Sequence, residues 1–170
     1  MKEVISQVNL QTQIGKLALA IKKYESRTDT PIVFVGILNG AFMFFSDLVK
    51  KIDTPMEIDF VRVKSYEGQE RKDIQFIKDL EVDIKGKHVY LVDDIIDSGH
   101  TMKYLIDIFK ERGATDVTPV AAVYKENLVI PDALCILEYS QNSPWFVGYG
   151  MDDEDGTCRN LKTIFEIDGK

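Results

Sequence analysis

Apolar runs alternate along this chain with stretches of helical periodicity, and this alternation restricts the fold more than any other feature. The run PIVFVGIL (31–38) is apolar throughout, as expected for a strand buried on both faces of a sheet. The stretch TMKYLIDIFKER (101–112) instead repeats its apolar residues at helical spacing, and Gly113 follows as a helix-ending glycine. Strands alternating with helices of about 10–15 residues predict an α/β fold, with a central, mainly parallel sheet flanked by helices.

The remaining segments follow the same pattern. The other predicted strands are MEIDFVRVKSY (56–66), IQFIKDL (74–80), KHVYLV (87–92), VTPVAAVY (117–124) and ALCILEY (133–139). The other predicted helices are QIGKLALAIKKY (13–24) and AFMFFSDLVKKI (41–52). We expect residues 1–170 to form a single domain, since this length is ordinary for one domain.

Composition excludes several classes of protein. The chain has 28 acidic and 21 basic residues and a net charge of −7, which argues against a nonspecific nucleic-acid binder. No apolar stretch is long enough to span a membrane, and MKEVISQVNL lacks the apolar core of a signal peptide. The two cysteines, Cys135 and Cys158, lack metal-ligand spacing. These features predict a cytoplasmic protein that binds neither nucleic acid nor membrane.

Ligands of parallel α/β sheets bind beyond the carboxyl ends of the strands. We therefore expect three segments to converge there: Leu38-Asn39-Gly40, residues 93–101, and the turn after Tyr124.

The stretch VYLVDDIIDSGHTM (89–102) combines a turn suited to an anion with acidic residues suited to hydroxyl groups or a cation. Ser98-Gly99-His100-Thr101 precedes a helix, whose free N–H groups favour a phosphate. Asp93 and Asp94 are suited to the vicinal hydroxyls of a ribose or to a hydrated Mg²⁺, and Asp97 to a general base or an electrostatic stabiliser. The residues thus favour a ribose 5-phosphate site. The plainer alternative is that Ser98 or Thr101 only caps the helix.

The same stretch resembles the phosphoribosyl-pyrophosphate (PRPP) motif of type I phosphoribosyltransferases, and DIIDSG is most similar to their hypoxanthine-guanine branch. Other landmarks of the family follow in order along nearly the whole chain. They are GILNGAFMFFSDL (36–48), KSYEGQERKDIQFIKDL (64–80), AAVYKENL (121–128), PWFVGYGMDD (144–153) and CRNL (158–161). The resemblance implies a small hood over the carboxyl ends of the sheet strands.

The resemblance implies a purine salvage enzyme that joins hypoxanthine or guanine to the phosphoribosyl group of PRPP, with Mg²⁺. The 5-phosphate would meet Ser98, Gly99, His100 and Thr101, the ribose hydroxyls would meet Asp93 and Asp94, and Asp97 would be the general base. Pyrophosphate would meet Leu38, Asn39, Gly40 and Arg159. Lys125, Trp145, Phe146 and Asp152 would bind the purine, and Asp152, Asp93 and Asp94 would hold the metal. Ser65 and Tyr66 would begin a mobile loop.

Several points stay open at this stage. Asp93 stands where the family often has Glu, and Asn39 replaces a common basic residue. The loop before Arg159 is one residue longer than usual, so Asp153 rivals Asp152 as the metal ligand. Xanthine is an alternative substrate, and a non-catalytic PRPP-sensing regulator of the same fold is an alternative function. The family further implies a homodimer or homotetramer, for which AFMFF (41–45) offers either an interface or core residues.

Overall fold

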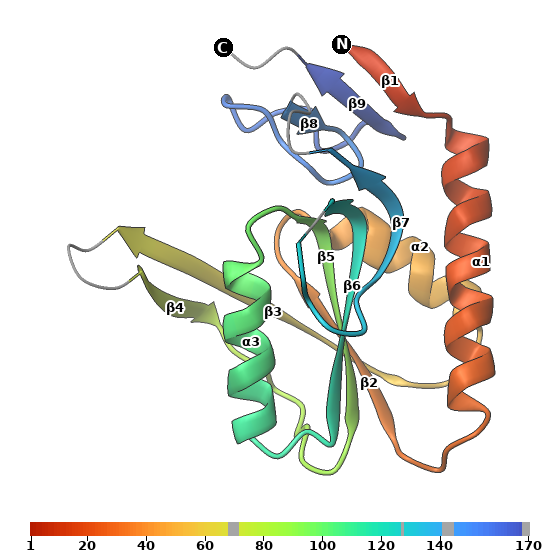
Figure 1. Cartoon of the computed structure of the whole chain (residues 1–170), viewed down its shortest axis with the longest axis vertical. Helices are drawn as coiled ribbons and strands as arrows, with labels where there is room; N and C mark the ends of the chain where they lie inside the picture. The colour runs from red at the N-terminus through yellow and green to blue at the C-terminus, as the bar shows by residue number, and fades with distance from the viewer. Residues whose placement is uncertain (68–71, 127, 141–144, 168–170) are drawn as a thin grey trace.

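The computed structural model describes residues 1–67, 72–126, 128–140 and 145–167, and its largest element is a six-stranded sheet (Figure 1). The strands lie in the order β4-β3-β2-β5-β6-β7. All neighbouring pairs are parallel except β3 and β4, which are antiparallel. The strands are β2 (Ile32–Ile37), β3 (Glu57–Glu67), β4 (Lys72–Lys78), β5 (His88–Ile96), β6 (Asp116–Lys125) and β7 (Leu134–Tyr139). The predicted α/β class, with a mainly parallel sheet, is confirmed.

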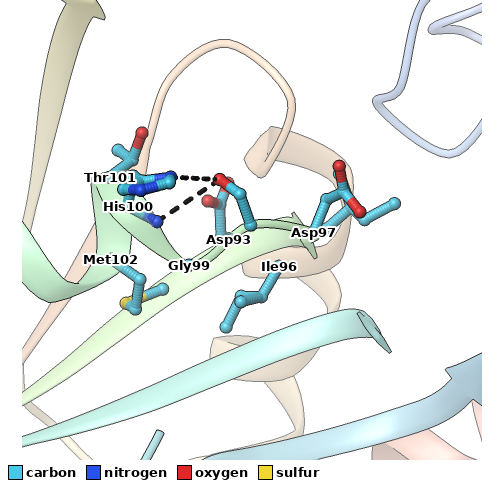
Figure 2. A pocket seen from close by; sticks show the side chains of 9 residues that line it. Asp93, Ile96, Asp97, Gly99, His100, Thr101 and Met102 are labelled. Carbon is cyan, nitrogen blue, oxygen red and sulfur yellow. Dashed lines mark hydrogen bonds between the residues drawn. The ribbon is translucent and has the colours of Figure 1, made fainter. Parts of the chain in front are cut away.

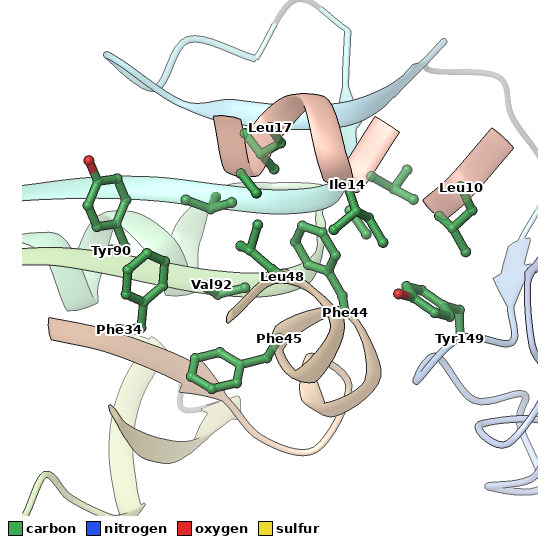
Figure 3. Packing of buried hydrophobic residues seen from close by; sticks show 14 of the residues in the cluster. Leu10, Ile14, Leu17, Phe34, Phe44, Phe45, Leu48, Tyr90, Val92 and Tyr149 are labelled. Atoms are coloured by element: carbon green, nitrogen blue, oxygen red, sulfur yellow. The ribbon is translucent and has the colours of Figure 1, made fainter. Parts of the chain in front are cut away.

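Three helices cover the two faces of this sheet: α1 (Gln7–Glu25), α2 (Phe42–Ile52) and α3 (His100–Glu111). Alternate residues of the central strands point to opposite faces. Phe34 and Tyr90 stack at 4.8 Å within the core that α1 and α2 cover (Figure 3). Val35 and Leu91 belong to the second core, which α3 covers. Burial on both faces explains why these strands are apolar throughout.

A second, three-stranded antiparallel sheet has the order β1-β9-β8. Its strands are β1 (Lys2–Ile5), β8 (Trp145–Val147) and β9 (Ile164–Ile167). Figure 1 shows this sheet beyond the end of the main sheet where β5 and β6 finish, as the hood of the family resemblance implies. The sequence reading did not predict β1, because its pairing partner β9 lies at the opposite end of the described chain.

Strand β5 does not end at Val92 but continues to Ile96, since its backbone stays paired with β6 through Ile96 and Tyr124. Asp93 and Asp94 are therefore strand residues rather than loop residues.

In α2, Phe44 and Phe45 are buried in the core, whereas Phe42 is 43% exposed. No helix of the described residues is long and apolar enough to cross a membrane.

Asp59 is a buried carboxylate that ties β3 to the chain after β4. It accepts hydrogen bonds from the backbone N–H groups of Glu81 and Val82 at 2.6 and 3.0 Å and pairs with Lys78 at 3.0 Å. Burial alone would raise the pKa of Asp59, but the backbone hydrogen bonds and Lys78 outweigh it and lower the pKa to about 2. The ionised form is therefore the stabilising one.

We expect Asp59→Asn to lower the free energy of unfolding by roughly 2 kcal/mol near neutral pH. Because the pKa is lower in the folded state, this stabilisation is complete above the unfolded pKa of about 4. It is lost as the pH falls through about 2. Urea denaturation at neutral pH and near pH 3 measures the difference, with the exposed Asp29→Asn as control. An equal loss at both pH values would contradict an ionised Asp59.

Candidate active site

The chain between β5 and α3 forms the wall of a hollow of about 180 Å³. In Figure 2, Asp93 lies in the middle of this wall, with His100 and Thr101 to its left and Asp97 to its right. Gly99 makes the turn in the left-handed region, with φ of 73°. A Cβ there would also lie 3.0 Å from the side chain of Ile130. Both the backbone conformation and the lack of space therefore favour glycine at this position.

The start of α3 shows which groups of residues 98–101 could bind phosphate and which could cap the helix. The N-cap is Gly99, whose position provides no capping side chain. The Ser98 hydroxyl accepts a long hydrogen bond of 3.4 Å from the backbone of His100 and lies 3.0 Å from that residue's Nδ1. The first turn of any helix leaves N–H groups without intrahelical partners. Here these groups lie at the hollow, where an anion would meet them.

Asp93 and Asp94 are half-buried neighbours near the end of β5, ahead of the predicted phosphate turn (residues 98–101). The Asp94 backbone N–H donates to Asp93 Oδ1 at 3.0 Å. Burial, followed by the charge of Asp94, raises the pKa of Asp93 well above its usual value. Hydroxyl donors or a cation beside the pair would relieve this repulsion.

The turn after β2 lies against this acidic pair. Its Leu38-Asn39 peptide is cis, and the Leu38 N–H donates to the Val61 carbonyl at 2.8 Å. A Cβ on Gly40 would lie 1.9 Å from Asp94 Oδ2, and one on Gly150 would lie 1.9 Å from the Gly40 carbonyl oxygen. The backbone at Gly40 therefore lies directly against the Asp94 carboxylate and against the backbone at Gly150. Only glycine, which has no Cβ, permits these contacts.

Asp97 accepts two hydrogen bonds on one oxygen, Oδ1. Lys125 Nζ donates at 2.6 Å from the end of β6, and the Tyr139 hydroxyl donates at 2.8 Å from the end of β7. The Lys125 hydrogen bond, assisted by that of Tyr139, lowers the pKa of Asp97 despite its partial burial. Lys125 and Asp97 were predicted as site residues, and the structure brings them into contact. Tyr139 was not predicted.

Four predicted site residues lie in β8 or in the chain between β8 and β9: Trp145, Phe146, Asp152 and Arg159. Trp145 is 59% exposed, so it does not belong to the core, and its Nε1 donates to the Asp152 carbonyl at 3.2 Å. Phe146 is buried and meets the Tyr139 ring edge-on at 5.0 Å. Arg159 donates to the Gly150 carbonyl at 2.7 Å and pairs with the Asp152 carboxylate.

Comparison with known proteins identifies the family of this chain. Residues 7–154 match the phosphoribosyl transferase domain family. The hypoxanthine-guanine phosphoribosyltransferase of Streptococcus pneumoniae is 41% identical over 78% of this chain and 74% of its own length. The hypoxanthine phosphoribosyltransferase of Haemophilus influenzae is 35% identical over 88% of this chain and 86% of its own length.

The chain belongs to the phosphoribosyltransferase family, in its hypoxanthine-guanine branch. A crystal structure of a hypoxanthine phosphoribosyltransferase from Staphylococcus aureus superposes with a TM-score of 0.88 at 31% identity, covering 98% of this chain and 90% of that one. The bifunctional protein TilS/HprT of Listeria innocua is 38% identical over 96% of this chain, which spans only 25% of that protein's length.

Within this phosphoribosyltransferase, the carboxylates of Asp152 and Asp153 have different hydrogen-bond partners. The Asp153 carboxylate accepts from the Thr157 N–H at 2.7 Å, from the Thr157 hydroxyl and from the Cys158 thiol at 3.3 Å. These bonds commit Asp153 to its own turn. Asp152 instead pairs with Arg159, and its role at the metal and the purine stays a prediction.

The predicted mobile loop of the phosphoribosyltransferase is described only in part. Ser65 and Tyr66 lie in β3, in register with Ile74 and Asp73 of β4. Residues 68–71, which carry most of the predicted loop, lie outside the described residues.

Proposed function

We propose that this chain transfers the 5-phosphoribosyl group from PRPP to a 6-oxopurine, giving IMP or GMP and pyrophosphate. One observation supports this most directly: the Asp97–Lys125 pair adjoins the turn suited to a phosphate. In this proposal, the site for the purine base would lie next to the site for the phosphorylated sugar. The named relatives in S. pneumoniae and H. influenzae support the same substrates.

The phosphate turn and the acidic pair would hold the two ends of the ribose. Backbone N–H groups of residues 98–101 face the 5-phosphate, and the hydroxyls of Ser98 and Thr101 add donors. Asp93 and Asp94 accept from the ribose hydroxyls, which lessens the repulsion between the two carboxyls. The sugar is therefore fixed at both ends, with its reacting carbon free.

The leaving pyrophosphate needs its charge neutralised as the bond to the ribose breaks. Leu38, Asn39 and Gly40 would supply backbone groups, and Arg159 would turn to it from Asp152. The described residues contain no group of three or more metal-ligating side chains. One or two carboxylates plus a pyrophosphate suit Mg²⁺, which rarely occupies an all-protein cage. Asp152, with Asp93 or Asp94, would hold Mg²⁺ where it neutralises the leaving group.

The purine would lie between Trp145 and the sheet, with its polar edge toward Phe146 and Asp152. Lys125 offers donors only, so its ammonium favours a 6-oxo oxygen and opposes a 6-amino group. Asp97 would accept the proton of the base nitrogen as the new bond to the ribose forms. Its lowered pKa keeps it ionised, and thus able to accept, at neutral pH.

The test is to incubate the protein with PRPP, Mg²⁺ and one of hypoxanthine, guanine, xanthine or adenine, and to measure nucleotide and pyrophosphate. We expect product with hypoxanthine, guanine or both, and none with adenine. Product with xanthine alone would replace the assignment to hypoxanthine and guanine by a xanthine-specific enzyme. PRPP binding without product from any base would favour a regulator, against which the paired Asp97 and Lys125 argue.

We expect Lys125→Ala to raise the KM for the 6-oxo base by about 10- to 100-fold, because it removes a charged hydrogen bond to the base. The KM for PRPP should change little, since Lys125 contacts Asp97 and not the phosphate turn. Initial rates with each substrate varied in turn measure both values, with the exposed Lys103→Ala as control. An equal rise in both KM values would contradict a role at the base.

The remaining proposals rest on chain length for the domain, on composition for the location and on the family resemblance for the assembly. We propose a single domain over residues 1–170, a cytoplasmic location and a homodimer or homotetramer. The exposed Phe42 on α2 is a candidate contact between subunits. Light scattering of the purified protein, with and without Phe42→Ser, tests the assembly.

A further inference from the structure

Tyr139 and Lys125 are cross-strand neighbours at the ends of β7 and β6. Their Cα atoms are partners in the parallel register, and the Glu126 N–H donates to the Tyr139 carbonyl at 2.8 Å. This register places both side chains beside Asp97, whose Oδ1 accepts from each of them. Backbone pairing thus brings the Tyr139 side chain to the place from which its hydroxyl reaches Asp97.

The two donors differ in how firmly they are held. The Lys125 side chain is 27% exposed and reaches Asp97 through a flexible stem. The Tyr139 ring is half-buried and packs edge-on against Phe146, with centroids 5.0 Å apart. Burial and the hydrogen bond to Asp97 raise the pKa of Tyr139, so its hydroxyl remains a donor throughout the working pH range.

We propose that Tyr139 is a positioning residue that holds Asp97 in place when Lys125 turns to the 6-oxo group of the purine. This inference rests on the proposed function, in which Lys125 meets the base and Asp97 takes its proton. Tyr139 does not touch the reacting atoms. It fixes Oδ1, which leaves the second carboxylate oxygen, Oδ2, for the base nitrogen. Among the described residues, no donor is paired with Oδ2.

The test compares Tyr139→Phe with the unchanged protein in the nucleotide assay. The phenyl ring keeps the packing against Phe146 and loses only the hydroxyl. We expect kcat to fall about tenfold, the loss typical of one hydrogen bond to a charged group, and KM for PRPP to stay unchanged. Tyr104→Phe is the matched control, a half-buried tyrosine on α3 away from Asp97.

The pH profile of kcat separates positioning from simple loss of packing. The Tyr139 hydroxyl helps to lower the pKa of Asp97, so removing it raises that pKa. We expect the acidic limb of the profile to move to higher pH in Tyr139→Phe and not in Tyr104→Phe. Loss of packing alone would lower thermal stability without moving the limb.

A double-mutant cycle shows whether Tyr139 acts through Asp97. On an Asp97→Asn background, Tyr139→Phe should lower kcat no further. A further tenfold loss there, or an unchanged kcat and pH profile in the single variant, would overturn the positioning role. An unchanged protein that makes no nucleotide would instead overturn the proposed function and this inference together.

Discussion

Asp97→Asn should keep the affinity for PRPP but lower kcat by about 10²- to 10⁴-fold, the usual loss for a general base. The asparagine side chain has nearly the same shape, and its amide oxygen can still accept from Lys125 and Tyr139. It cannot take up a proton from the purine. Steady-state rates at saturating base, together with PRPP binding by calorimetry, measure the two effects separately.

The control for this substitution is Asp107→Asn, an exposed acid on α3 outside the hollow. It changes the net charge by the same amount and should leave kcat unaltered. If Asp97→Asn turned over as fast as the unchanged protein, Asp97 would have no part in proton transfer. The proposed proton acceptor would then have to be sought elsewhere in the site.

Gly40→Ala should lower kcat/KM for PRPP by about 10²-fold, because the site depends on contact distances that a methyl group does not allow. The new Cβ would lie 1.9 Å from Asp94 Oδ2, so the carboxylate would have to swing away or the turn would have to shift. Either movement displaces a predicted pyrophosphate contact or a predicted ribose contact. Initial rates at varied PRPP measure the loss.

Gly15→Ala is the matched control for the added methyl group. Gly15 lies within α1, and a Cβ there meets nothing within 4 Å. Alanine is more favourable than glycine in the interior of a helix, so this variant should gain about 1 kcal/mol of stability and keep full activity. Normal kcat/KM in Gly40→Ala would show that the approach of Gly40 to Asp94 is not needed for PRPP binding.

The turn from β5 to α3 was predictable residue by residue because its chemistry is local. Ser98, Gly99, His100 and Thr101 are consecutive, and a helix start always provides free N–H groups. The strand boundary was less predictable. Asp93 and Asp94 look like the start of a loop by polarity, but backbone pairing with β6 extends the strand through them.

Tyr139 shows where sequence reasoning failed within the candidate site. As the last residue of a half-apolar strand, it has no pattern that distinguishes it from a core or rim tyrosine. Its contact with Asp97 joins residues 42 positions apart and requires β7 to pair with β6 in one particular register. The contact between Tyr139 and Asp97 can be predicted only once that strand order and register are known.

The sequence by itself determined the α/β class and the family resemblance, and it located the acidic pair and the turn that is predicted to bind phosphate. Periodicity and consecutive residues act over a few positions, and these features need nothing more. Tertiary structure alone decided that Gly40 meets Asp94, that Asp152 rather than Asp153 faces Arg159, and that Tyr139 shares Asp97 with Lys125. Each of these depends on strand order, register and glycine-permitted approach, which bring distant segments together only after the sheet and its hood have formed.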